Sequence, residues 1–154
     1  MKINYTKGDA TQPKGEGYKI LTHICNDIGG WGRGFVGAIS RRWKEPEQKY
    51  RAWFKSKENF VLGEVQFVEV RSDLSIANII GQHGIYAKNA NIPIRYEAVR
   101  EGLKKVAEFA KEKEASVHMP RMGAGLAGGK WEEITKIIED ELISEEISVT
   151  VYDF

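Results

Sequence analysis

At 154 residues, with 42% hydrophobic and 29% charged residues, the chain is long enough to bury one sizeable core, so we expect a single domain over residues 1–154. Its 23 lysines and arginines balance 22 acidic residues, which argues against binding to nucleic acid or membranes through a general positive charge. The N-terminal segment has no signal-peptide core, and no run approaches the roughly 18 apolar residues of a membrane-spanning helix, so a cytoplasmic protein is expected.

Segments with strand character alternate along the chain with segments of helical pattern. The strands are expected at residues 1–6, 18–25, 64–70, 75–82, 115–120 and 147–154. The helices are expected at residues 35–44, 46–57, 92–113 and 130–144. Strands separated by helices are typical of an α/β fold, in which a mostly parallel sheet is covered on both faces and ligands bind where strands end and helices begin.

Cysteine and metal-ligand patterns exclude two kinds of site. The one cysteine, Cys25, can form no internal disulfide and lies in an apolar strand pattern, so a structural thiol is expected. No group of histidine, cysteine and acidic residues has the spacing of metal ligands, so we expect no metal ion and no cofactor.

Three loops follow predicted strands, at residues 26–34, 83–91 and 122–129. The first, "NDIGGWGRG", and the third, within "MGAGLAGGKW", are rich in glycine, which lets backbone amides point together toward one bound group. On neighbouring strands they could hold the two phosphates of a diphosphate. Neither sequence is a P-loop or a dinucleotide-binding fingerprint, and each is explained equally well as a tight turn between a strand and a helix.

Taken together, the motifs resemble the macrodomain family. The resemblance rests on "KGDAT" (7–11), "HICNDIGGWGRGFVGAI" (23–39), "ANIIGQ" (77–82), "MPRMGAGLAGGKW" (119–131) and the closing "SVTVYDF". The most similar branch of the family contains the yeast-type ADP-ribose 1''-phosphate phosphatase. The resemblance implies a three-layer α/β/α fold with a mixed, mostly parallel central sheet, which binds ADP-ribose in a cleft at the strand ends.

The resemblance also implies roles for individual residues. Asp9, with Ala10 beside it, would accept a hydrogen bond from the adenine amino group, and Asn26 would contact the distal ribose. The alternatives are that Asp9 is a turn residue and that Asn26 only stabilises its loop. Tyr152 or Phe154 could stack on adenine. The walls of the diphosphate site would comprise Gly30, Trp31, Gly32, Gly34, Phe35 and Val36 in the first loop, and Gly123, Ala124, Gly125, Leu126 and Ala127 in the second.

Two positions depart from a neighbouring branch of the family. The branch that removes ADP-ribose from glutamate uses a lysine nucleophile and an aspartate where this chain has Gln82 and Ala127. A glutamine amide cannot form the covalent intermediate of a lysine amine, and alanine supplies no acid or base. The sequence therefore argues against that reaction, and against the related removal of ADP-ribose from DNA.

Hydrolysis of ADP-ribose 1''-phosphate needs a group that handles protons and donors that stabilise the phosphoryl oxygens. His23 is the first candidate for the general acid or base, and Asn26 could fix the ribose or the attacking water. Strand alternation places His23 on the face of Leu21 and Cys25, so a buried core histidine is the alternative. His83 is the reserve candidate, together with Asp27.

Two classes of function remain open from the sequence. The chain is either an enzyme that hydrolyses a small ADP-ribose derivative, or a non-catalytic module that binds free ADP-ribose or an ADP-ribosylated protein. A nucleotide-binding protein unrelated to ADP-ribose is a third, less favoured class. A fold alone does not decide between them, because function depends on the residues of the site.

Overall fold

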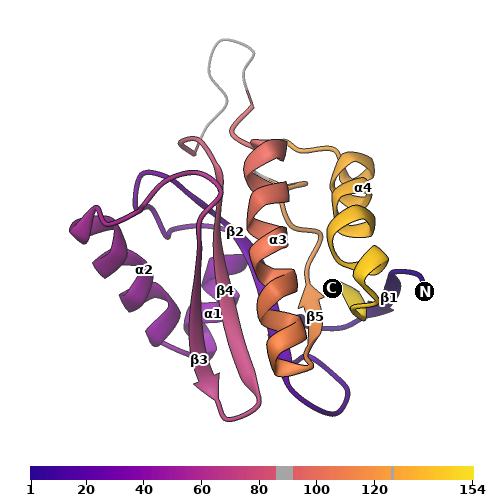
Figure 1. The fold of residues 1–154 in the computed structure, drawn as a ribbon. Helices are drawn as coiled ribbons and strands as arrows, with labels where there is room; N and C mark the ends of the chain where they lie inside the picture. Colours follow the sequence, from indigo (N-terminus) through magenta and orange to yellow (C-terminus); the bar gives the residue numbers. More distant parts are fainter. Residues whose placement is uncertain (86–91, 126) are drawn as a thin grey trace.

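The computed structural model of the chain describes residues 1–85, 92–125 and 127–154. In these residues one sheet lies between two layers of helices (Figure 1). The strands are β1 (Asn4–Lys7), β2 (Lys19–Asn26), β3 (Val65–Arg71), β4 (Leu74–Gln82), β5 (Ser116–Met119) and β6 (Val149–Asp153). The helices are α1 (Phe35–Arg42), α2 (Glu45–Ser56), α3 (Tyr96–Lys113) and α4 (Trp131–Glu141), followed by a 3-10 turn, η1 (Ile143–Glu145).

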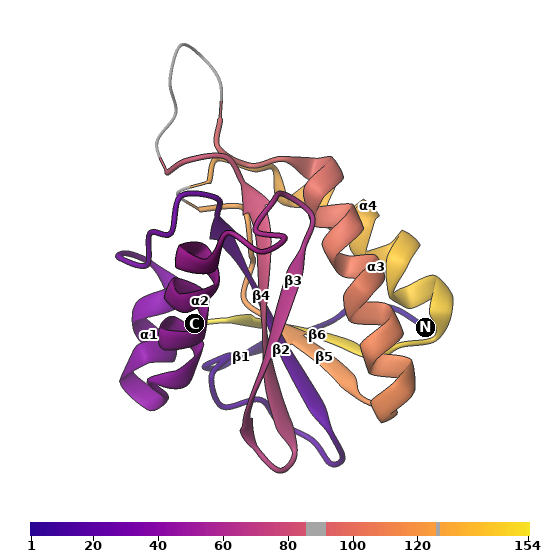
Figure 2. The same cartoon turned by 60° about the vertical axis from the view of Figure 1, so that its left-hand side comes forward.

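The strand order in the sheet is β1-β6-β5-β2-β4-β3. All neighbouring strands pair in parallel except the edge strand β3, which runs antiparallel to β4. The pair α1 and α2 covers one face, and α3 and α4 cover the other (Figure 2). The predicted α/β/α architecture with a mixed, mostly parallel sheet is therefore confirmed.

Three predicted helices are shorter in the structure than expected. The helix expected at 35–44 ends at Arg42. The helix expected at 92–113 begins at Tyr96, because Pro93 restricts the residue before it and Ile94 pairs with Gln82 in a short antiparallel bridge. The helix expected at 130–144 ends at Glu141 and continues only as the 3-10 turn. The bridge between Ile94 and Gln82 connects the start of α3 to the end of β4, next to the third predicted loop.

Each face of the sheet carries its own apolar core. Between the sheet and the helices α3 and α4, the core contains aliphatic residues such as Ile79 of β4, Leu103 of α3 and Ile134 of α4. Against α1 and α2, the core is richer in aromatic residues and includes Tyr50, which is fully buried. Cys25 is also buried in this second core, as expected for a structural thiol. Within the described residues, no helix has the length and apolar character needed to cross a bilayer.

Gly102 is where α3 approaches β4 most closely. A Cβ atom at this position would lie 2.5 Å from Cγ2 of Ile79, well inside contact distance. Gly37 in α1 is a control position, because it is also a helical glycine but has space around it. A Cβ atom there would meet only the end of the Arg41 side chain, at 3.6 Å.

We predict that Gly102→Ala lowers the free energy of unfolding by about 1–3 kcal/mol, because the sheet and helix must separate. Gly37→Ala should be neutral or stabilising by up to about 1 kcal/mol, because alanine favours a helix where space allows. Urea unfolding of both variants and the wild type measures the difference. Equal stability of Gly102→Ala and wild type would show that the contact is not tight.

Candidate ligand-binding site

A pocket of about 290 Å³ opens at the carboxyl ends of the parallel strands β2, β4 and β5. The strand ends, the start of α1 and the loop after β5 all contribute to it. Its lining consists of His23, Ile24, Arg33, Gly34, Phe35, Val36, Gln82, Pro120, Arg121, Met122, Gly123, Gly125 and Ala127. The fold therefore brings the two glycine-rich loops, far apart in sequence, to the walls of one cavity.

The first wall is the loop that leads into α1. Gly34, the residue before the helix, has φ of 81° and ψ of −142°, a backbone conformation that favours glycine. Among the described residues, no side chain caps this helix end, and its first turn contains no acidic residue. The first backbone N–H groups of α1, from Phe35 and Val36, therefore form the positive end of a helix beside the pocket, where an anion is favoured.

The second wall is the loop after β5. Gly123 has φ of 80°, and a Cβ atom there would lie 3.0 Å from the side chains of both Ile24 and Ile94. The Gly129 N–H donates to the Gly123 carbonyl oxygen at 2.7 Å, and the Ile94 N–H donates to the Ala127 carbonyl oxygen at 3.1 Å. These bonds hold the loop close to the sheet, and glycine at position 123 lets it pack directly against the isoleucine side chains.

Asn26 holds the first loop together. Its Oδ1 accepts hydrogen bonds from the backbone N–H groups of Ile28 and Gly30, each at 3.0 Å, and lies 2.9 Å from the Tyr50 hydroxyl. Its Nδ2 donates to the Gly30 carbonyl oxygen at 2.8 Å. The side chain is thus engaged within its own loop, which fits the alternative role in loop stabilisation, and contact with a ribose stays a prediction.

His23 lies beneath the pocket and is only 1% exposed. Its Nε2 lies 2.5 Å from Oδ1 of Asn78, whose Nδ2 donates to Pro46 and Gln66. Asn78 therefore presents an acceptor, and the His23 proton sits on Nε2. Nδ1 has no hydrogen-bond partner in the described structure. Burial lowers the pKa of His23 to about 4, so the ring is neutral at pH 7, and this environment corresponds to the alternative of a core histidine.

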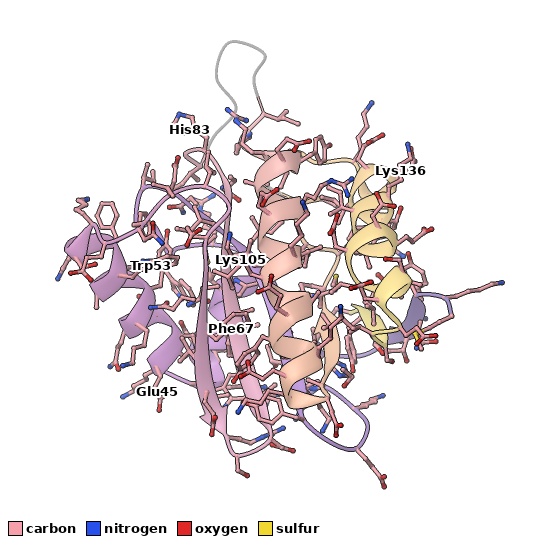
Figure 3. All side chains as sticks on the ribbon, in the orientation of Figure 1. Glu45, Trp53, Phe67, His83, Lys105 and Lys136 are labelled. Atoms are coloured by element: carbon pink, nitrogen blue, oxygen red, sulfur yellow. The ribbon has the colours of Figure 1, made fainter. Side chains whose placement is uncertain are left out.

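Asp27 and His83 form a hydrogen-bonded pair, and His83 directly follows Gln82, which lines the pocket. Oδ2 of Asp27 lies 2.7 Å from Nδ1 of His83, and Oδ1 accepts the Gly84 N–H at 2.8 Å. The pair joins the loop after β2 to the loop after β4, and Figure 3 shows His83 at the upper end of the sheet. The His83 side chain is 65% exposed. Since the carboxylate fixes one ring nitrogen, the other is directed away from it and is accessible for proton transfer.

The comparison with known proteins decides the family. The family model described as "Macro domain" matches residues 22–138, most of the chain. The chain belongs to the macrodomain family. The membership predicted from the motifs is therefore confirmed.

Relatives of this macrodomain agree with the assignment. A structure titled as a macrodomain protein from Streptomyces coelicolor is 51% identical, with a TM-score of 0.89, and the match covers 99% of each chain. ADP-ribose 1''-phosphate phosphatase of Lodderomyces elongisporus is 24% identical over 99% of this chain and 100% of its own length. Mouse chromodomain-helicase-DNA-binding protein 1-like is 34% identical over 161 residues, and this chain spans only 18% of its length.

Several predicted site residues of this macrodomain lie outside the lining of the pocket. Trp31 is buried, donates its indole N–H to Ser40 at 2.8 Å, and packs against His23 and Tyr50. Trp31 is therefore part of the core against α1 and α2. Ala10 is also buried. The other residues outside the lining are Asp9, Asn26, Gly30, Gly32, His83, Ala124 and Phe154, and Leu126 lies outside the described residues.

At the opposite end of the site, the two aromatic candidates for adenine stacking differ in exposure. Phe154 is fully exposed at the end of the chain, whereas Tyr152 is buried, with its hydroxyl bonded to His118 and to the Lys14 N–H. Only Phe154 could therefore reach a bound base. Asp9 accepts hydrogen bonds from the Thr11 backbone and hydroxyl; burial raises its pKa, but these bonds and Arg42 outweigh burial and lower it.

Two arginines of the pocket were absent from the predicted site. Arg33 lies between two glycines of the first loop, and it forms no ion pair within the described residues. Arg121 directly follows β5 and forms a two-pronged ion pair with Asp153. Their positions in the sequences "GRG" and "MPRMG" could have revealed them, because a cation beside open backbone amides indicates a site for an anion. In the part of the chain that the structure describes, no cluster of three metal-ligating side chains is found.

The two buried histidines predict an acid-sensitive fold. Burial lowers the pKa of His23 and of His118 to about 4, below the ordinary value of 6.5. Between pH 4 and pH 6.5 the unfolded chain binds more protons than the folded chain. The contribution of the neutral histidines to the free energy of unfolding is therefore fully present above pH 6.5 and is lost as the pH falls toward 4. Each histidine contributes a slope of roughly 1.4 kcal/mol per pH unit.

We therefore predict that the free energy of unfolding of His23→Gln depends less steeply on pH between 6.5 and 4.5 than that of the wild type. Thr22→Val, a buried substitution on the same strand that changes no titratable group, serves as the matched control and should keep the wild-type slope. Urea unfolding at several pH values measures all three slopes. A wild-type slope in His23→Gln would contradict the neutral, buried state of His23.

Proposed function

We propose that this macrodomain binds ADP-ribose or a derivative in the pocket, and that it hydrolyses ADP-ribose 1''-phosphate to ADP-ribose and phosphate. One observation carries the proposal: two glycine-rich walls and two arginines surround one pocket, and His83, paired with Asp27, directly follows the lining residue Gln82. The 24% identity to the Lodderomyces elongisporus phosphatase over its whole length supports the same substrate class.

The diphosphate would lie between the two walls. The open N-terminus of α1 supplies amides on one side, and the backbone around Gly123 and Gly125 supplies them on the other. At about 290 Å³, the pocket is at the lower end of the range for small-molecule sites, which suits the diphosphate and the adjacent sugar rather than the whole ligand. The adenine would extend toward Asp9 and Phe154, where a carboxylate oxygen accepts from its amino group.

His83 is the residue that we assign to proton transfer. In the reaction a water oxygen attacks phosphorus, the bond from phosphorus to the ribose oxygen breaks, and the leaving oxygen gains a proton. An imidazole held by a carboxylate can give that proton or take one from the water. The guanidinium groups of Arg33 and Arg121 would bind the phosphoryl oxygens as negative charge builds up. His23 and Asn26 would then act by holding the floor and the wall of the pocket.

A non-catalytic role in binding ADP-ribose is the second candidate. The observation in its favour is that His23, the histidine suggested by the resemblance to the phosphatase branch, is buried and bonded to Asn78. Gln82 and Ala127 line the pocket without a nucleophile or an acid. If His83 formed only a surface ion pair with Asp27, the pocket would bind its ligand without turnover.

Phosphate release from ADP-ribose 1''-phosphate separates the two candidates. We predict that the wild type releases phosphate, and that His83→Gln lowers kcat by about 100-fold or more, the usual effect of losing a general acid or base. Asp27→Asn should lower kcat less, because the histidine remains. Binding of ADP-ribose, measured by calorimetry on the same samples, should stay within about threefold of the wild type in both variants.

His118→Gln is the matched control for histidine loss, because His118 lies within β5 and bonds to Tyr152 rather than lining the pocket. It should retain the wild-type kcat when folded. Binding of ADP-ribose without phosphate release by the wild type would contradict the enzyme and leave the binding module. Equal binding of AMP and ADP-ribose would contradict both.

A further inference from the structure

A second cavity, of about 400 Å³, lies at the carboxyl end of α1. It is formed by the loop after β1, the last turn of α1 and the end of β3. Its lining includes Arg41, Arg42 and Arg71, and no acidic residue among those described. The pocket of the proposed function adjoins the other end of the same helix, whose eight residues span about 12 Å. The two cavities are therefore separate sites.

Arg42 is held in place by hydrogen bonds to Thr11 and Asp9. Its Nε donates to Oγ1 of Thr11 at 2.6 Å, and its Nη2 lies 3.3 Å from Oδ2 of Asp9. Thr11 is 1% exposed and donates its own hydroxyl proton to Oδ1 of Asp9 at 2.6 Å. A guanidinium that is already fixed loses less conformational entropy when a ligand binds. Within the described structure, its Nη1 has no hydrogen-bond partner.

The cavity has an excess of positive charge. Arg41 has no ion-pair partner among the described residues, and Arg71 uses its Nε for Asp73 at 3.1 Å. Three guanidinium groups thus face two carboxylates, of Asp9 and Asp73. The carboxyl end of a helix carries roughly half a negative charge, which Arg41 and Arg42 in the last turn of α1 would offset. This effect does not account for Arg71, which comes from β3.

Trp43 adds an open hydrogen-bond donor to the lining. The other three tryptophans donate their indole N–H groups to Ser40, to the Glu58 carbonyl oxygen and to Tyr5. The Trp43 N–H has no acceptor within the described residues, and it is not among the buried unpaired atoms. A solvent-accessible N–H beside three arginines is a donor available to a ligand.

We propose that this cavity binds a phosphate group, either as the free dianion or as a phosphomonoester. Guanidinium groups match phosphate oxygens in pairs of hydrogen bonds, and three arginines from different segments can reach several oxygens of one tetrahedral group. Trp43 and Pro13 add flat apolar surface, which a base attached to the phosphate could cover. The proposal does not depend on the function of the other pocket, and the two sites can be measured separately.

The test uses the Trp43 indole N–H as a local probe. In ¹H–¹⁵N spectra of the full chain, Trp43→Phe assigns its signal, and inorganic phosphate is titrated at constant ionic strength. We expect a saturable shift of this signal, separate from any shift of the Gly34 and Gly123 amides. Arg41→Ala should weaken phosphate binding at this probe by about tenfold or more, as expected for the loss of a charged hydrogen-bond donor.

Lys136→Ala is the matched control, since it removes the same charge from α4, on the other face of the sheet from α1 (Figure 3). It should leave the phosphate titration unchanged. A parallel titration with uridine 5′-monophosphate identifies the source: tighter binding than phosphate indicates a nucleotide, and equal binding indicates the phosphate group alone. The proposal is overturned if the Trp43 signal does not shift while the protein is folded, or if Arg41→Ala and Lys136→Ala behave alike.

Discussion

The parallel pairing of β2 with both β4 and β5 determines where every loop of the site lies. Because all three strands run in the same direction, their carboxyl ends meet at one edge, and Asn26 at the end of β2 pairs with Gln82 at the end of β4. The register shifts between Cys25 and Asn26, where the chain leaves the sheet and enters the first loop. Residues separated by about a hundred positions therefore line one pocket, and this arrangement is the one that α/β folds commonly use for ligands.

Each wall then depends on a few specific side chains or on their absence. The Asn26 carboxamide uses its oxygen and nitrogen to close the first loop, and Gly34 lets the backbone enter α1 with its first amides uncovered. Gly123 lets the side chains of Ile24 and Ile94 approach the loop where a Cβ atom would crowd them. Beneath them, burial keeps His23 neutral and outweighs its bond to Asn78, which by itself would raise the pKa of the ring. The floor of the pocket is thus neutral, and charged groups lie at its rim.

The sequence predicted the layers, the strands and the family correctly because each depends on patterns that extend over many residues. Individual roles were harder to predict, since they depend on partners distant in the chain. Strand alternation placed His23 on the same face of β2 as Cys25. The hydrogen-bond partner of the buried ring is Asn78 on β4, and the sequence alone does not bring these two residues together. The role of Asn26 depends on its own loop and on Tyr50. Pro93 signalled the late start of α3, but its bridge partner could not be predicted.

The position of bound ADP-ribose in a crystal structure of the complex tests the account most directly. The account predicts the diphosphate between the first amides of α1 and the backbone at Gly123, with adenine toward Asp9 and the distal ribose within reach of His83. A diphosphate bound away from these two walls would contradict it. A distal ribose directed away from His83 would contradict the assignment of that residue to proton transfer.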